Sequence, residues 1–222
     1  MKNFLALLLL ALLAACCNKQ STYKDSMQSS DVPSISHSVA KANFDKIKSL
    51  EGNWVLIGGK RLGKPVDPVP GKPFLTYNIS AGGHAVIEKL FAGTSKEMVS
   101  IYYLADSDLM MDHYCSLGNQ PRMVALPSDD FKIEFKMIGI TNFNDENDLH
   151  ISSHALEING QDELTAYWGA TSNQTVSPGS HYIVKRSKRL RANAPSCNHN
   201  KKIFNIHFAV SVNIASTNCR TS

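Results

Sequence analysis

The sequence lacks any apolar run long enough to cross a lipid bilayer as a helix, which requires about 20 residues. Its longest apolar run extends from Phe4 to Ala15 and consists almost wholly of Leu and Ala. A run of this length suits the core of a secretory signal peptide, typically about 7–15 residues, and Lys2 supplies the positive start of such peptides. We therefore expect residues 1–15 to be a signal peptide and no segment to form a transmembrane helix.

Charged residues are also scarce, at 19% of the chain, and they are unevenly distributed. The formal net charge of +4 comes from the two ends of the chain. Residues 189–222 contain basic residues and no acidic ones, whereas acidic residues slightly outnumber basic ones in residues 43–188. The central region therefore gives no reason to expect a nucleic-acid partner, which would favour a basic surface.

Cysteine is too sparse in the central region to form a disulfide framework, because only Cys115 of the five cysteines lies there. Metal motifs are missing as well. The acidic loop at residues 142–148 lacks the order of ligands that a Ca²⁺ loop requires, and we expect a solvated turn. His150 and His154 would lie roughly 13 Å apart on one strand, too far to bind one ion together. We expect no cofactor on these grounds.

The apolar run ends in Leu13-Ala14-Ala15-Cys16, which resembles the lipobox of bacterial lipoproteins. The resemblance implies cleavage before Cys16 and acylation of its thiol, and two or three acyl chains give stable anchoring. We therefore expect a protein of the bacterial cell envelope, lipid-anchored to a membrane on its periplasmic or outer surface. The alternative is an ordinary signal peptide that is cleaved nearby.

Composition divides the remainder into three parts. Residues 16–42 are polar, with almost no apolar pattern, and we expect a flexible tether. Residues 43–188 form the expected domain. In the basic tail at residues 189–222, apolar side chains alternate from Phe204 to Ile214, which is typical of a strand, although a disordered tail is also compatible with the composition. Its two cysteines could pair only if the segment folds back as a hairpin.

The domain has many short apolar runs separated by turn residues and no long helical pattern, which predicts an all-β fold. We expect an antiparallel up-and-down barrel of about nine or ten strands, because such closure removes exposed sheet edges. Phe44, Ile47 and Leu50 predict a short N-terminal helix, and the Gly- and Pro-rich residues 58–73 predict a loop. The expected strands begin at Trp54 and continue through residues 74–79, 85–91, 99–105, 109–115, 122–126, 131–137, 150–158, 163–168 and 181–185.

Several short motifs stand out between residues 43 and 186, and the longest is the block from His113 to Met123. The others are Phe44–Gly52 with Trp54, Gly82-Gly83, Glu88, Gly93-Thr94, Glu97-Met98-Val99 and Tyr102. Together they resemble the motifs of a family of uncharacterised bacterial proteins described as lipocalin-like, with a calycin-type β-barrel. The block from His113 to Met123 is the most specific part of the resemblance, which implies a small calycin-like barrel and no established activity.

Strand alternation places Met111, His113 and Cys115 on one face, with the imidazole and the thiol about 6–7 Å apart. Three functions are compatible with this face. A Cys–His nucleophile pair would make an enzyme, and a soft ligand face could bind haem or a metal. The third is a pocket for a small apolar or amphipathic ligand, which we favour. A purely structural role for these side chains is also open.

The pocket hypothesis assigns ligand contacts to residues at the mouth of the barrel. It assigns no catalytic or metal-binding role. The expected ligand-binding residues are Glu88, Tyr102, His113, Cys115, Asn119, Gln120 and Arg122.

Overall fold

A computed structural model describes residues 33–187 except residues 145–146. The expected signal peptide, Cys16, most of the expected tether and the basic tail lie outside the described residues. Within the described residues, no helix is both long and apolar enough to cross a membrane.

The chain enters the domain through helix α2, His37–Lys48. The helix begins inside the range expected to be tether, because Ser36 provides an N-cap whose side chain accepts a hydrogen bond from the Val39 amide at 3.4 Å. Its apolar face is buried at Phe44 and Ile47, as the helical spacing predicted. Strand β1 follows at Gly52.

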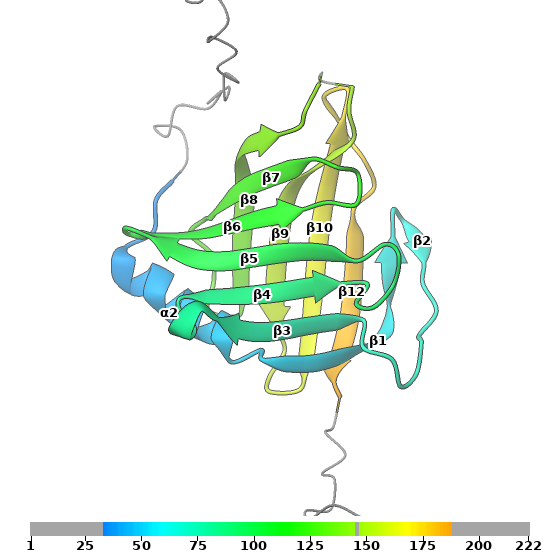
Figure 1. Cartoon of the computed structure of the whole chain (residues 1–222), viewed down its shortest axis with the longest axis horizontal. Helices are drawn as coiled ribbons and strands as arrows, with labels where there is room; N and C mark the ends of the chain where they lie inside the picture. Colours follow the sequence, from blue (N-terminus) through cyan, green and yellow to red (C-terminus); the bar gives the residue numbers. More distant parts are fainter. Residues whose placement is uncertain (1–32, 145–146, 188–222) are drawn as a thin grey trace, which may run out of the picture. The chain divides into compact units, whose positions relative to one another are not determined.

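Ten antiparallel strands of the described chain form a closed up-and-down barrel, which confirms the predicted fold class (Figure 1). Each strand pairs with its neighbours in chain order, and β12 closes the barrel by pairing with both β1 and β10. The short strands β2 and β11 pair only with β1 and β10, respectively. The bounds are β1 Gly52–Arg61, β2 Lys64–Pro65, β3 Leu75–Ser80, β4 Ala85–Leu90, β5 Met98–Ala105, β6 Asp108–Tyr114, β7 Gln120–Ala125, β8 Lys132–Thr141, β9 His150–Ile158, β10 Glu163–Ser172, β11 Thr175–Val176 and β12 Ser180–Arg186.

The loop predicted at residues 58–73 is shorter than expected, because β1 continues through Gly58 and Gly59 to Arg61. A bulge separates the pairing of Leu56 from that of Gly58. Gly59 has φ 130°, and a side chain there would collide with the carbonyl group of His181 on β12. Glycine at this position therefore permits a close approach of two strands rather than ending the strand.

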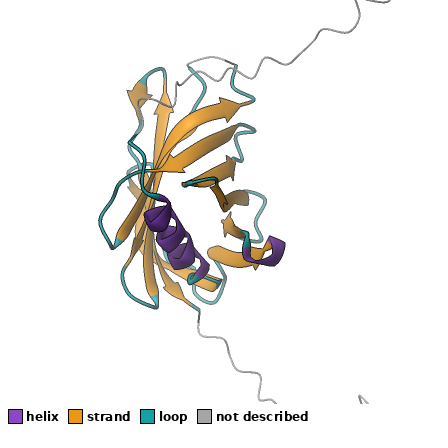
Figure 2. Cartoon of the chain, turned by 90° about the vertical axis from the view of Figure 1, so that its left-hand side faces the viewer, coloured by secondary structure: helices purple, strands orange, loops and turns teal. Residues whose placement is uncertain are grey.

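Helix α2 closes one end of the barrel, as Figure 2 shows from that side. It contacts β5 and β6, and Lys46 donates to the Asp130 carbonyl oxygen in the β7–β8 loop at 2.9 Å. The apolar core lies between this helix and the inward-facing side chains of the strands. Trp54 and Tyr77 are among the fully buried side chains of this core.

Candidate functional site

A cavity of about 120 Å³ lies at the end of the barrel away from α2. Its wall is formed where β4 and β6 end and where β5 and β12 begin. The helix lies instead against the end that holds the β7–β8 loop. The lining is mainly apolar and includes Leu90, Phe91, Met98, Ile151, Ala170 and Tyr182.

The lining changes in character from the mouth of the cavity to its inner end. Arg61, Leu62 and Leu117 are exposed and therefore mark the mouth. His113 and Trp168 also line the cavity but are 0% and 4% exposed, so they mark its inner end. Their ring centroids lie 4.7 Å apart. A mouth that includes one arginine thus leads to two buried rings that each carry a polar nitrogen.

Behind His113, a row of polar side chains continues into the barrel interior. The Nδ1 atom of His113 lies 3.0 Å from the Ser100 hydroxyl, which in turn lies 3.3 Å from Oε1 of Glu88. Ser100 pairs with His113 in the β5–β6 ladder and with Glu88 in the β4–β5 ladder. The strand register therefore places all three side chains side by side on the inner face. All three are buried.

The same carboxyl group leads to a second histidine. Oε2 of Glu88 lies 2.8 Å from the Tyr102 hydroxyl, which lies 2.9 Å from Nε2 of His154. Nδ1 of His154 is 2.8 Å from the backbone carbonyl oxygen of Tyr167. The His154 ring packs on Trp168, with centroids 3.9 Å apart. The interior thus holds a continuous polar chain from His113 to the Tyr167 carbonyl group.

Burial governs the protonation of this chain. Loss of solvation lowers the pKa of His113 to about 4 and that of His154 to about 3, so both imidazoles are neutral near pH 7. The same loss of solvation raises the pKa of Glu88, although hydroxyl groups of Tyr77, Tyr102 and Ser100 oppose it by stabilising the carboxylate. In this row of polar side chains, the pKa of each ionisable group is therefore shifted toward its uncharged form.

Two buried nitrogen atoms of residues that line the cavity lack a hydrogen-bond partner among the described residues. They are Nε2 of His113 and Nε1 of Trp168. Leaving a buried polar atom unpaired costs about 1–3 kcal/mol, so native proteins rarely do so without a reason. Both residues border the cavity. A ligand or water in the cavity could supply the missing partners.

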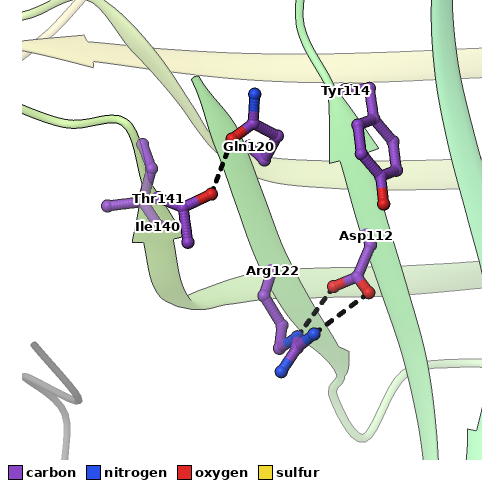
Figure 3. Close-up of a pocket in the computed structure, with 6 residues that line it drawn as sticks. All are labelled: Asp112, Tyr114, Gln120, Arg122, Ile140 and Thr141. Carbon is purple, nitrogen blue, oxygen red and sulfur yellow. Dashed lines mark hydrogen bonds and ion pairs between the residues drawn. The ribbon is translucent and has the colours of Figure 1, made fainter. Parts of the chain in front are cut away.

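The residues predicted to share one mouth separate into an inner and an outer group. Glu88, Tyr102 and His113 lie together in the interior, and Cys115 lines the cavity. Glu88 and Tyr102 are too deep to line the mouth itself, because each is 0% exposed. Figure 3 shows the position of two others, Gln120 and Arg122.

Gln120 and Arg122 line a separate groove of about 170 Å³ (Figure 3), and His113 is not among its lining residues. Arg122 binds the Asp112 carboxylate there at 2.8 Å, and Gln120 accepts a hydrogen bond from Thr141 at 2.6 Å. Asn119 is buried nearby, and its amide donates to the Leu149 carbonyl oxygen at 3.0 Å. Because alternate side chains of β7 face opposite sides of the sheet, Arg122 faces outward while Met123 is buried.

Cys115 and His113 share the cavity wall, but no hydrogen bond joins them within the described part of the chain. The thiol instead contacts the Met98 sulfur at 3.8 Å. Burial raises the pKa of Cys115, although backbone amides at residues 116–117 partly oppose the effect. The group is therefore held as a thiol, whereas nucleophilic catalysis requires a thiolate. This environment does not favour the Cys-dependent enzyme.

The sequence analysis missed Ser100, His154 and Trp168 as parts of the site. A signal for Ser100 was present, because a tight turn at Asp106-Ser107 pairs residue 100 with residue 113 once β5 and β6 are extended. His154 and Trp168 come from β9 and β10, far along the barrel wall. Only barrel closure brings them to this face. Local spacing carries no such information.

The described residues contain no group of three or more His, Cys, Asp or Glu side chains that could hold a metal ion. Comparison with known proteins adds no assignment. No protein-family model matches the chain, and a search of curated proteins finds no match either.

Proposed function

We propose that this chain is a lipid-anchored protein of the bacterial cell envelope whose barrel binds a small apolar or amphipathic ligand. The observation that carries the binding proposal is the apolar cavity with two unpartnered nitrogen atoms among its lining residues, on His113 and Trp168. Ligand sites typically combine an apolar wall with a few polar groups that fix orientation. This cavity has both features.

The volume of the cavity limits the size of the ligand. Drug-sized ligands occupy pockets of about 300–1,000 Å³, whereas an engineered cavity of about 150 Å³ binds benzene. A cavity of about 120 Å³ therefore suits a ligand, or the buried end of one, of roughly that size. The same comparison disfavours haem, whose macrocycle is several times larger than benzene. His113 alone offers a nitrogen lone pair for such a group.

Membrane attachment rests on the sequence. The Leu- and Ala-rich run and the Leu13-Ala14-Ala15-Cys16 segment support acylation of Cys16, and the polar residues that follow would separate the barrel from the membrane. The proposal predicts that the wild-type protein incorporates an alkynyl fatty acid in bacterial cells and sediments with membranes. Cys16→Ser should abolish both properties, and the adjacent Cys17→Ser is the matched control. Sedimentation of Cys16→Ser with membranes would count against the anchor.

Ligand binding can be tested with toluene as a probe of the cavity. The exported chain carrying Cys16→Ser avoids detergent, which could itself occupy the cavity. Toluene should raise the melting temperature in a concentration-dependent manner, because a ligand that binds only the folded state stabilises it. Ala170→Leu should remove this effect, since Ala170 is buried in the cavity wall. Ala105→Leu is the matched control, because Ala105 lies at the end of β5 that is away from the cavity.

Native mass spectrometry of the same protein provides an independent result. A co-purifying small molecule that is lost in Ala170→Leu would identify the natural ligand class. The binding proposal fails if toluene gives no stabilisation and no small molecule accompanies the protein.

A further inference from the structure

The polar chain behind the cavity has a hydrogen-bond direction that can be worked out atom by atom. Its starting point is the Tyr167 carbonyl oxygen, which can only accept. Nδ1 of His154 lies 2.8 Å from that oxygen and must therefore carry a hydrogen. Because burial favours the neutral imidazole, Nε2 of His154 then holds a lone pair.

The lone pair on His154 determines the next two groups. The Tyr102 hydroxyl lies 2.9 Å from Nε2 and has one hydrogen, which it donates to that atom. Tyr102 donates to Oε2 at 2.8 Å when Glu88 is ionised. With the Tyr102 hydrogen donated to His154, the hydrogen between these two oxygens must instead come from a protonated Glu88 carboxyl group. Desolvation of Glu88, which also faces Tyr77 and Ser100, acts in the same direction.

The other branch of the hydrogen-bonded row runs through Ser100. Oε1 of Glu88 carries no hydrogen, so the Ser100 hydroxyl donates to it at 3.3 Å. Ser100 must accept from His113, so Nδ1 of His113 carries the hydrogen at 3.0 Å. Nε2 of His113 is left with a lone pair. The same His113 tautomer follows if Glu88 is ionised and His154 is doubly protonated, because Ser100 still donates to Oε1.

The two buried residues that line the cavity therefore carry one acceptor and one donor. Nε2 of His113 can only accept, and Nε1–H of Trp168 can only donate. Both atoms are buried without a partner in the described chain. The two rings pack against each other, with centroids 4.7 Å apart.

We propose that the cavity selects a small apolar ligand with a neutral hydroxyl head group, an alcohol or a phenol. The hydroxyl group donates to Nε2 of His113 and accepts from Nε1–H of Trp168, while the apolar body fills the space toward Leu90 and Ile151. This inference deepens the proposed binding function and rests on it. A carboxylate fits poorly, because it has no hydrogen to donate and would bury a charge. A hydrocarbon leaves both nitrogens unpaired.

The ligand class can be tested with phenol and toluene, which have the same number of heavy atoms. Calorimetry with the exported chain carrying Cys16→Ser should show that phenol binds about ten- to a hundredfold more tightly than toluene, because sites that pair a hydroxyl group reject analogues that lack it. Trp168→Phe should reduce this preference. Gln120→Ala, on the outer face, is the control variant and should leave it unchanged.

The His113 tautomer can be measured without any ligand. Long-range ¹H–¹⁵N correlation spectra should show a protonated Nδ1 and an unprotonated Nε2, and phenol should shift the Nε2 resonance. His113→Asn assigns the signals, and His84→Asn is a matched control because His84 is exposed. A protonated Nε2 in the free protein would overturn the inference even if phenol binds.

The outcomes distinguish the two proposals. If phenol and toluene bind with equal affinity, the cavity is a binding site but the hydroxyl selectivity is refuted. If neither binds, the proposed binding function fails as well. If phenol is preferred and Trp168→Phe retains the full preference, the assignment of the donor is wrong.

Discussion

Replacement of Glu88 by Gln tests the protonation of the buried chain most directly. A protonated carboxyl group accepts on Oε1 and donates from Oε2, and a glutamine amide can reproduce both roles toward Ser100 and Tyr102. The second amide hydrogen can reach toward the Tyr77 hydroxyl, which interacts with the carboxyl group of Glu88 in the wild type. We expect Glu88→Gln to change the free energy of unfolding by less than about 1.5 kcal/mol at pH 5.5, the scale of one hydrogen bond.

Glu88→Leu is the contrasting variant. It removes both roles and leaves two buried hydroxyl groups, on Ser100 and Tyr102, without their partner. At about 1–3 kcal/mol for each unsatisfied group, it should cost roughly 2–6 kcal/mol. The two variants have similar side-chain volumes. Their difference therefore measures hydrogen bonding rather than packing.

The pH dependence supplies the decisive comparison. Because the pKa of Glu88 is raised in the folded state, the stability that its proton provides is fully present below the unfolded pKa of about 4.3. It is lost as pH rises toward the folded pKa, by up to about 1.4 kcal/mol per pH unit. Gln carries no titrating proton. Glu88→Gln should therefore gain stability relative to the wild type as pH rises from 5.5 to 8.

Urea unfolding, followed by Trp fluorescence across this pH range, measures the difference. Contributions from His113 and His154 are common to both proteins and cancel. The reasoning is refuted if Glu88→Gln is as damaging as Glu88→Leu at every pH. That result would instead indicate an ionised Glu88 that is bridged by Tyr102 to a doubly protonated His154.

Three further predictions concern other parts of the barrel. The pKa values of His113 and His154 are lowered to about 4 and about 3, so their neutral forms stabilise the fold fully above pH 6.5. As pH falls below 6.5, the free energy of unfolding of Glu88→Gln, measured with urea, should fall by up to about 2.8 kcal/mol per pH unit. A flat profile would contradict burial of neutral imidazoles. Gly59→Ala should lose about 1–3 kcal/mol or more through strain at φ 130° and the collision with β12, whereas Gly58→Ala, which meets open space, should be nearly neutral in the same assay. Cys115 should react with iodoacetamide more slowly than glutathione at pH 8, because burial raises its pKa; faster reaction would restore the enzyme hypothesis.

The barrel was predictable because its signals are local. Alternation of apolar residues and the turn residues between them predicted the strands. Strand alternation also predicted that Met111 and His113 share one face, and the structure shows both buried. The same rule could have separated Arg122 from the site. Arg122 adjoins Met123, which is buried, and a residue adjacent to an inward-facing one in a strand faces outward.

The remaining parts of the site were not predictable from spacing because they depend on barrel closure. His154 reaches Tyr102 across a sequence separation of 52 residues, and Trp168 meets His113 from β10. The prediction of a loop beginning at residue 58 was also wrong. Paired glycines are typical of loops, but Gly58 and Gly59 lie in β1. The close approach to β12 that requires Gly59 is a tertiary contact.

The buried polar chain itself argues that this end of the barrel is a binding site. Glu88, Ser100, Tyr102 and two histidines occupy inward positions that apolar side chains of similar size could fill with equal or greater stability. Departures from an apolar core are typical of functional sites. Here the chain has one defined consequence at the cavity, since it fixes the tautomer of His113 and leaves a lone pair at Nε2. Tyr102→Phe would remove one hydroxyl group from this row of hydrogen bonds and so release the constraint. It would not alter the cavity wall, because Tyr102 does not line it. Altered ligand selectivity in this variant, with an unchanged cavity, would connect the buried chain to recognition.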